Sequence, residues 1–134
     1  MTAANKKINI REELARAQEC LRSAELLEAH GQTADAVSRL YYHAYHAVRA
    51  LLLSRGLEPK THEGTVRLLG LHFVKPGILE AKSSHVFSKL MKYREEADYN
   101  PSYVFTREDY ATFNEEAAKL YSAILKFLKK EKLV

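Results

Sequence analysis

The sequence contains little cysteine and little glycine. Cys20 is the only cysteine among the 134 residues, so the chain has no internal disulfide, as is typical of proteins from a reducing compartment. We expect Cys20 to act as a small buried hydrophobe. The five glycines are scattered and form neither a phosphate-binding loop nor a dinucleotide-binding fingerprint. The glycine-rich motifs of kinases and dehydrogenases are therefore missing, and no serine lies in a nucleophile elbow.

Long hydrophobic runs and alternating patterns are also missing. No apolar run is long enough to cross a bilayer, and the start of the chain leads into no apolar core of the kind found in signal peptides. No segment alternates polar and apolar residues with the period of a strand. We therefore expect a soluble, cytoplasmic, all-α protein without a membrane partner.

The residues that are present follow a helical period along the whole chain. A chain of 134 residues, 46% of them hydrophobic, can bury one core, so we expect a single domain over 1–134 that is ordered over about 9–131. Breaks at glycine and proline positions divide the chain into predicted helices over 9–30, 33–55, 62–74, 79–99 and 107–131. Short connections between helices favour antiparallel neighbours, so the expected fold is an up-and-down bundle of four to five helices.

The predicted helix 33–55 has two distinct faces when its residues are placed about 100° apart. One face is an apolar stripe of Val37, Leu40, Tyr41, Ala44, Val48, Leu51 and Leu52. The other face carries Arg39, Tyr42, His43, His46 and Ala50. Aromatic rings, imidazoles and guanidinium groups suit stacking, anion contact or a partner surface better than simple solvation. We expect this second face to take part in function.

The predicted helix 79–99 places two opposite charges on its apolar side. Arg94 and Asp98 continue the stripe formed by Val86, Phe87, Leu90 and Met91. Because an unpaired buried charge is very costly, the two groups should pair with each other or with neighbours. One interpretation is a buried ion pair that fixes helix register. The other is that Arg94 binds a phosphate while Asp98 holds the guanidinium in place.

The histidines give no metal signature. His43 and His46 are three residues apart, but no further ligands are evident, so polar packing is the better interpretation. His62 and Glu63 begin like a zinc-protease helix, yet Val66 occupies the position that the second histidine needs. We expect no metal and no cofactor.

Tyrosines near the two arginines suit a nucleotide ligand. Tyr42, Tyr99 and their neighbours lie near Arg39 or Arg94, so a ring could stack on a base while a guanidinium contacts phosphate. Most of the eight tyrosines should simply pack. The net charge of +4 is compatible with RNA or ATP as a ligand, although the charge is not gathered into a basic stripe.

Three segments together resemble the HEPN domain family. They are residues 36–47 (Ala-Val-Ser-Arg-Leu-Tyr-Tyr-His-Ala-Tyr-His-Ala), residues 61–64 (Thr-His-Glu-Gly) and residues 94–99 (Arg-Glu-Glu-Ala-Asp-Tyr). The resemblance implies a helical bundle that dimerises and is encoded beside a minimal nucleotidyltransferase as a toxin–antitoxin pair. It further implies that active members are metal-independent ribonucleases, with an Arg followed four to six residues later by a His. In some pairs the nucleotidyltransferase attaches AMP to a tyrosine near that motif.

The chain departs from this family motif at the histidine. Arg94 matches the motif Arg, but no histidine follows it, and the candidate catalytic residues are Arg94, Asp98 and Tyr99. We expect a homodimeric HEPN-type component of a toxin–antitoxin-like module, which partners a nucleotidyltransferase and binds nucleotide or RNA phosphate in a dimer cleft. The expected binding residues are Arg39, Tyr42, His43, His46 and Arg94. One alternative is a ribonuclease toxin whose motif lacks the usual histidine. The other is a non-catalytic dimeric interaction module.

Overall fold

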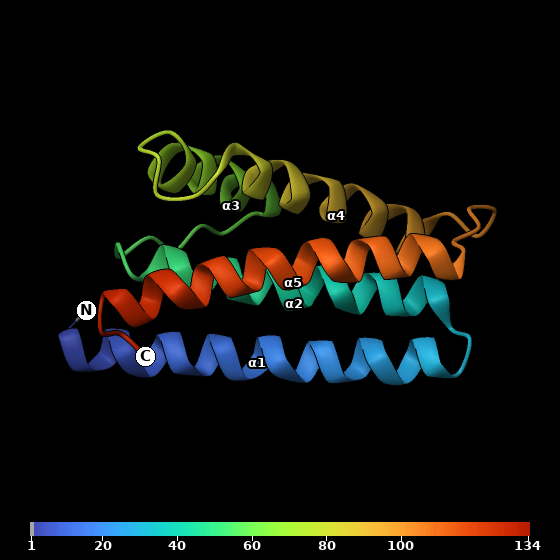
Figure 1. Ribbon diagram of the computed structural model, residues 1–134, viewed down its shortest axis with the longest axis horizontal. Coiled ribbons are helices and arrows are strands. Elements are labelled where there is room, and N and C mark those ends of the chain that lie inside the picture. The colour runs from blue at the N-terminus through green and yellow to red at the C-terminus, as the bar shows by residue number, and fades with distance from the viewer. Residues whose placement is uncertain (1) are drawn as a thin grey trace.

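The computed structural model describes residues 2–134 and contains only helices and connections in that range. The α-helices are α1 (Ala3–Ala29), α2 (Thr33–Leu53), α3 (His62–Leu69), α4 (Ala81–Tyr99) and α5 (Arg107–Lys130). One π-helical turn, η1 (Gly70–Val74), continues α3. The long helices run alternately up and down the bundle (Figure 1). The predicted all-α, up-and-down architecture is therefore confirmed.

Helix boundaries differ from the predicted ones at two places. Helix α1 begins at Ala3 rather than near residue 9, because the Thr2 side chain caps it by accepting a hydrogen bond from the Asn5 amide at 3.1 Å. The predicted helix 62–74 is α-helical only to Leu69 and ends in the wider π turn. Hydrophobic period alone cannot separate these two helix types, because both place apolar residues toward the core.

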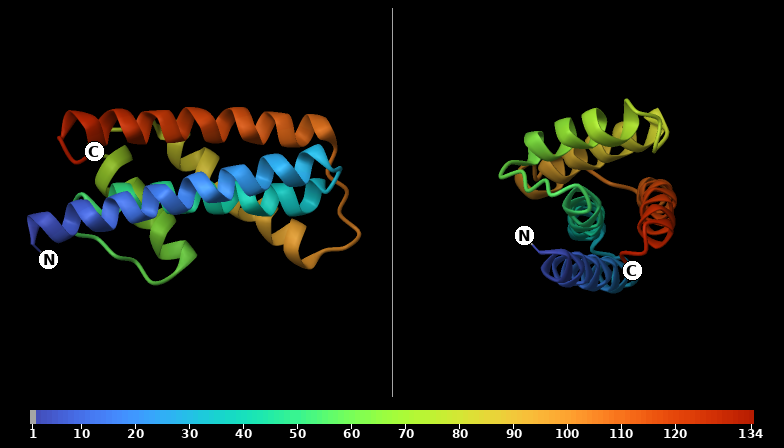
Figure 2. Two further views of the ribbon diagram at one scale, coloured as in Figure 1. Left: turned by 90° about the horizontal axis from the view of Figure 1, so that it is seen from below. Right: turned by 90° about the vertical axis from the view of Figure 1, so that its left-hand side faces the viewer.

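Helix α2 lies at the centre of the bundle. It packs against α1, α4 and α5, and the end-on view in Figure 2 shows these helices around it. Thirteen of its 21 residues are buried, which is more than a single apolar stripe supplies. The second face of this helix is therefore not one accessible surface, because His43 is 1% exposed and Ala50 is 0% exposed.

Small side chains let α1 approach that second face closely. Ala17, Cys20 and Ala24 of α1 are all at most 2% exposed, and small residues at a helix contact shorten the distance between axes. Burial raises the pKa of the Cys20 thiol, so Cys20 behaves as the expected small hydrophobe. Helix α1 therefore packs on the second face of α2, the face that the sequence pattern predicts to be polar.

A capping box starts α5. The Thr106 hydroxyl accepts from the Asp109 amide at 3.1 Å, and the Asp109 carboxylate accepts from the Thr106 amide at 2.8 Å. This cap fixes the point where the chain turns back after α4. The end of α4 and the start of α5 are consequently held at the same end of the bundle (Figure 1).

Candidate functional site

Arg94 is a buried charge on α4. The residue is 7% exposed, and its guanidinium carbon lies 5.3 Å from the centre of the Tyr41 ring and 6.0 Å from that of Tyr42. Both rings come from α2. The part of α4 that carries Arg94 therefore meets α2, the helix with the second face. A guanidinium over aromatic faces gains cation–π attraction, which partly offsets its removal from water.

Two carboxylates form ion pairs with Arg94 but lie beyond hydrogen-bond distance of it. The Asp98 carboxylate is 3.8 Å from Nη1, and the Glu95 carboxylate is 4.0 Å from Nη2. Nε is buried without a hydrogen-bond partner, and Arg94 donates no hydrogen bond to any residue in the described range 2–134. A buried guanidinium has five donors in a fork that matches carboxylate or phosphate. The site therefore has an unused capacity to bind an anion.

Arg39 and Asp98 border a surface hollow beside Arg94. The hollow has a volume of about 370 Å³ and is lined by Leu27, Asp35, Ser38, Arg39, Tyr42 and Asp98. The Arg39 guanidinium carbon lies 4.7 Å from the Tyr42 ring centre. Tyr42 thus lies near both arginines, and the predicted site residues Arg39, Tyr42, Arg94 and Asp98 are brought together.

His62 joins this cluster from the start of α3. Its Nδ1 is 2.5 Å from the Tyr41 hydroxyl, and its ring centre lies 5.6 Å from Tyr41 and 6.2 Å from Tyr42. Burial and, next in size, the positive charge of Arg94 lower the pKa of His62. Burial likewise raises the pKa of Tyr41 far above its ordinary value, so the phenol stays protonated. Arg94 and His62 therefore lie against the same two tyrosine rings.

His43 and His46 lie outside this cluster. The His43 ring is buried, its Nδ1 is 2.7 Å from the Ala17 carbonyl oxygen, and burial lowers its pKa. Because the pKa is lowered, the ring is neutral near pH 7 and Nδ1–H donates to the carbonyl. His46 instead faces Glu13 of α1 at 3.4 Å. The structure therefore separates these two histidines from Arg94.

The polar contacts of His46 belong to a network between α1 and α2. Arg49 Nε donates to the Glu13 carboxylate at 2.8 Å, and Nη1 donates to the Pro59 carbonyl at 3.2 Å. Burial opposes ionisation of Glu13, but the hydrogen bonds from His46 and Arg49 keep the pKa of Glu13 below its ordinary value. This network joins two helices and the segment before α3.

Tyr99 lies at the end of α4 and is 76% exposed. Its side chain is free to meet a partner, whereas Tyr93 packs on Phe113 with ring centres 5.0 Å apart. Val104, in the following connection, is 79% exposed. An accessible tyrosine and an accessible apolar side chain therefore follow Arg94 along the chain.

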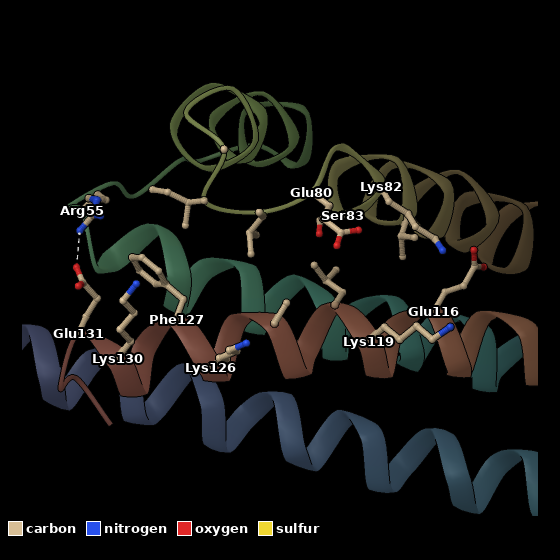
Figure 3. Close-up of a pocket in the computed structure, with 16 residues that line it drawn as sticks. Arg55, Glu80, Lys82, Ser83, Glu116, Lys119, Lys126, Phe127, Lys130 and Glu131 are labelled. Carbon is tan, nitrogen blue, oxygen red and sulfur yellow. Dashed lines mark hydrogen bonds and ion pairs between the residues drawn. The ribbon is translucent and has the colours of Figure 1, made fainter.

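A larger groove lies away from the Arg94 site. It has a volume of about 760 Å³ and runs between the start of α4 and the end of α5, with the side chains of Lys82, Lys126 and Phe127 along it (Figure 3). Its acids are partly paired, as in the Arg55–Glu131 ion pair at 3.2 Å. None of the predicted site residues lines this groove, and its cations are lysines and the exposed Arg55 rather than a buried guanidinium.

Within residues 2–134, no group of three or more histidine, cysteine or acidic side chains is arranged to hold a metal ion. In the same range, no helix is long and apolar enough to span a membrane. The candidate site therefore consists of Arg94 and the side chains around it.

Comparison with known families identifies the fold family. The model of the HEPN domain matches residues 10–131. This chain belongs to the HEPN domain family. The matched range begins in α1 and ends just after α5, so the resemblance carried by residues 36–47, 61–64 and 94–99 extends over the bundle.

Relatives of this HEPN protein include two that match over most of their length. "Putative toxin MJ0605" of Methanocaldococcus jannaschii is 35% identical over 90% of this chain and 92% of its own length. A UPF0332 protein of Thermotoga maritima is 31% identical over 84% of this chain and 86% of its own. "UPF0332 protein PH1297" of Pyrococcus horikoshii is 48% identical, over 47% of this chain and 44% of its own length.

Two residues at the site of this HEPN protein were missed by the sequence interpretation. Tyr41 was assigned to the apolar stripe, and His62 was given no role at the site, although it was considered in a zinc-protease helix and in the segment 61–64. The available signal was the Thr-His-Glu-Gly segment at 61–64, which contributes to the family resemblance. Its proximity to Arg94 could not be read from sequence, because 32 positions separate His62 from Arg94 and only the packing of α3 on α4 joins them.

Proposed function

We propose that this chain is the HEPN component of a toxin–antitoxin-like module and binds nucleotide or RNA phosphate at Arg94. Two relatives carry the printed name "putative toxin", and a toxin-like HEPN protein is the class that the family membership supports. The partner in this proposal is a nucleotidyltransferase, and the protein acts as a homodimer.

The contrast between the half-buried Arg49 and the buried Arg94 supports phosphate binding. Arg49 meets Glu13 at 2.8 Å and a carbonyl at 3.2 Å, whereas the carboxylates of Asp98 and Glu95 approach Arg94 only to 3.8 Å and 4.0 Å, beyond hydrogen-bond distance. A buried charge without hydrogen bonds is costly. A phosphate oxygen pair would supply the missing acceptors with bidentate geometry.

The surroundings of Arg94 suit the rest of a nucleotide. The neighbouring hollow contains the Tyr42 ring and the Arg39 guanidinium, which offer a stacking surface and a second cation. Tyr99 and Val104 are exposed after Arg94 along the chain. In the proposed homodimer a second copy covers these side chains and closes the hollow into a cleft.

Equilibrium binding of ATP and a short single-stranded RNA tests the proposal. We expect Arg94→Ala to weaken binding at least about tenfold, the loss of one charge-assisted hydrogen bond. Arg22→Ala is the matched control, because it removes the same charge from an exposed position on α1. Absence of binding by the unaltered protein, or equal weakening in both variants, would contradict the proposal.

RNA cleavage is a second candidate function, because His62 supplies a histidine beside Arg94 although none follows it in sequence. An imidazole can move a proton at the ribose 2′-hydroxyl, and a guanidinium can stabilise charge on phosphorus. Cleavage in EDTA that is lost in both Arg94→Ala and His62→Gln would support it. Intact RNA after incubation with the unaltered protein would exclude it.

A further inference from the structure

We propose that a phosphodiester bound at Arg94 is also contacted by His62, and that His62 takes up one proton as the phosphodiester binds. This inference rests on the proposed function, and it assigns a ligand class and a pH dependence to the same site. It adds a residue from α3 to a site that is otherwise built from α2 and α4.

His62 and Arg94 lie against the same pair of tyrosine rings. The Arg94 guanidinium lies 5.3 Å and 6.0 Å from the ring centres of Tyr41 and Tyr42, and the His62 ring lies 5.6 Å and 6.2 Å from the same two centres. The positive charge of Arg94 is also, after burial, a cause of the lowered pKa of His62, as expected when a guanidinium lies near an imidazole. A single anion between them would contact both.

The hydrogen bond to Tyr41 fixes which nitrogen of His62 is available. Nδ1 is held at 2.5 Å by the Tyr41 hydroxyl, while no hydrogen bond from residues 2–134 engages Nε2. A hydroxyl can donate to a neutral imidazole or accept from a charged one. The Tyr41 contact therefore survives protonation of the ring, and Nε2–H remains free to donate to a phosphate oxygen.

The charges around His62 keep the free protein's ring neutral near pH 7. Burial and the positive charge of Arg94 act against protonation, while the carboxylates of Glu63 and Glu95 favour it only in part. The remaining titratable neighbours are the phenols Tyr41, Tyr42 and Tyr45. A bound anion offsets the charge of Arg94, so it removes the main electrostatic opposition to the imidazolium.

A phosphodiester fits these charges better than a terminal phosphate. It carries one negative charge, which matches Arg94 without strong repulsion from the nearby Asp98 and Glu95 carboxylates. A terminal phosphate ester itself gains a second charge with a pKa of about 6. A phosphodiester does not titrate in that range, so any pH dependence of its binding belongs to the protein.

Calorimetric titration with a dinucleoside monophosphate tests the inference. The 2′-deoxy sugar is used so that the probe cannot be cleaved through its 2′-hydroxyl. We expect affinity to rise several-fold between pH 8 and pH 5.5, toward the limit of about tenfold that follows when binding raises one pKa by about one unit. His62→Gln should remove most of this rise, and His85→Gln, an exposed histidine elsewhere on α4, should keep it.

Proton uptake is measured on the unaltered protein, so the test does not depend on a folded variant. At pH 6.5 the binding heat should differ between MES and Bis-Tris, buffers of different ionisation enthalpy, by the amount expected for up to one proton taken up. Binding that depends on Arg94 but is independent of pH and of buffer would overturn this inference and leave the proposed function standing. Absence of binding at every pH would overturn both.

Discussion

At the scale of single residues, the half-buried Arg49 and the buried Arg94 make different use of their guanidinium groups. Arg49 of α2 is hydrogen-bonded to Glu13 and to a carbonyl, and it ties α2 to α1. Arg94 of α4 is 7% exposed, makes no hydrogen bond within residues 2–134, and lies over tyrosine rings. Arg49 therefore forms a structural ion pair. In our proposal, Arg94 keeps its hydrogen-bond donors for a ligand.

This contrast predicts different effects of methionine at the two positions. Arg49→Met leaves the Glu13 carboxylate half-buried without its main partner, so we expect it to lower the free energy of unfolding by about 2 kcal/mol. Arg94→Met removes an unsatisfied charge and keeps the length of the side chain. We expect its free energy of unfolding to stay within about 1 kcal/mol of the unaltered protein, or to rise.

Urea unfolding at pH 7 measures both variants in parallel. Equal destabilisation of the two would indicate that Arg94 is held by a structural ion pair with Asp98, the alternative interpretation of these residues.

The buried imidazole of His43 gives the protein a pH-dependent stability. Burial lowers the pKa of His43, so the unfolded chain takes up this proton at a higher pH than the folded one does. Stability is therefore complete above the ordinary histidine pKa and declines as pH falls through that value toward the lowered one. We expect a decline approaching about 1.4 kcal/mol per pH unit for one histidine.

Urea unfolding at pH 7.5 and pH 5 checks this expectation, and His43→Phe should reduce the difference. His62→Gln separates the contribution of the other histidine with a lowered pKa. An identical pH dependence in His43→Phe would show that His43 does not cause the decline.

At the scale of helices, the position of α2 decides which sequence features become a site. Helical period gave the angular position of each α2 residue, and it gave the buried stripe of Leu40, Tyr41 and Val48. It could not say that small residues of α1 would cover His43 and Ala50. Which helix covers which face depends on contacts between segments far apart in sequence, and no local pattern contains them.

The candidate site, too, could be predicted only in part from the sequence. Burial of Arg94 beside Asp98 could be predicted, because both lie on the stripe that includes Leu90. That Arg39 and Tyr42 lie near Arg94 was expected only because all three were predicted to bind a ligand in the same cleft. The contribution of His62 required the packing of α3 on α2 and α4, and the sequence signal for it was one short segment.

The capping box of α5 gives a prediction at this scale. Thr106→Ala removes the acceptor for the Asp109 amide, so we expect it to lower the free energy of unfolding by about 1 kcal/mol. Thr112→Ala is the control, because Thr112 is exposed within the same helix, where alanine is the better helix former. Chemical denaturation should show a loss at position 106 and none at position 112. A loss of equal size at both positions would argue against the cap.

At the scale of the whole molecule, the two most exposed of the large hydrophobic side chains described lie at the end of α4 and just after it. Tyr99 and Val104 are 76% and 79% exposed, and both follow Arg94 along the chain. Water contact with such side chains is unfavourable, and a second copy would remove it. The dimer cleft of our proposal therefore lies beside the anion site rather than at the lysine-lined groove between α4 and α5 (Figure 3).

The proposed dimer predicts the effect of a charge in this connection. We expect the protein to be dimeric by light scattering and Val104→Asp to be monomeric, because the substitution places a carboxylate in the apolar contact. Ile8→Asp is the control, since Ile8 is an exposed apolar residue near the other end of the bundle. A monomeric unaltered protein, or a dimer that Val104→Asp leaves intact, would argue against this interface.

The central claim, that Arg94 is retained for an anionic ligand rather than for stability, is tested most directly by thermal unfolding with and without a dinucleotide. A ligand that binds only the folded state raises the unfolding temperature. We expect the dinucleotide to raise it for the unaltered protein and to leave Arg94→Met unchanged, with the two proteins unfolding at similar temperatures when no ligand is present. A variant that unfolds at a much lower temperature, together with no effect of the dinucleotide on the unaltered protein, would contradict the claim.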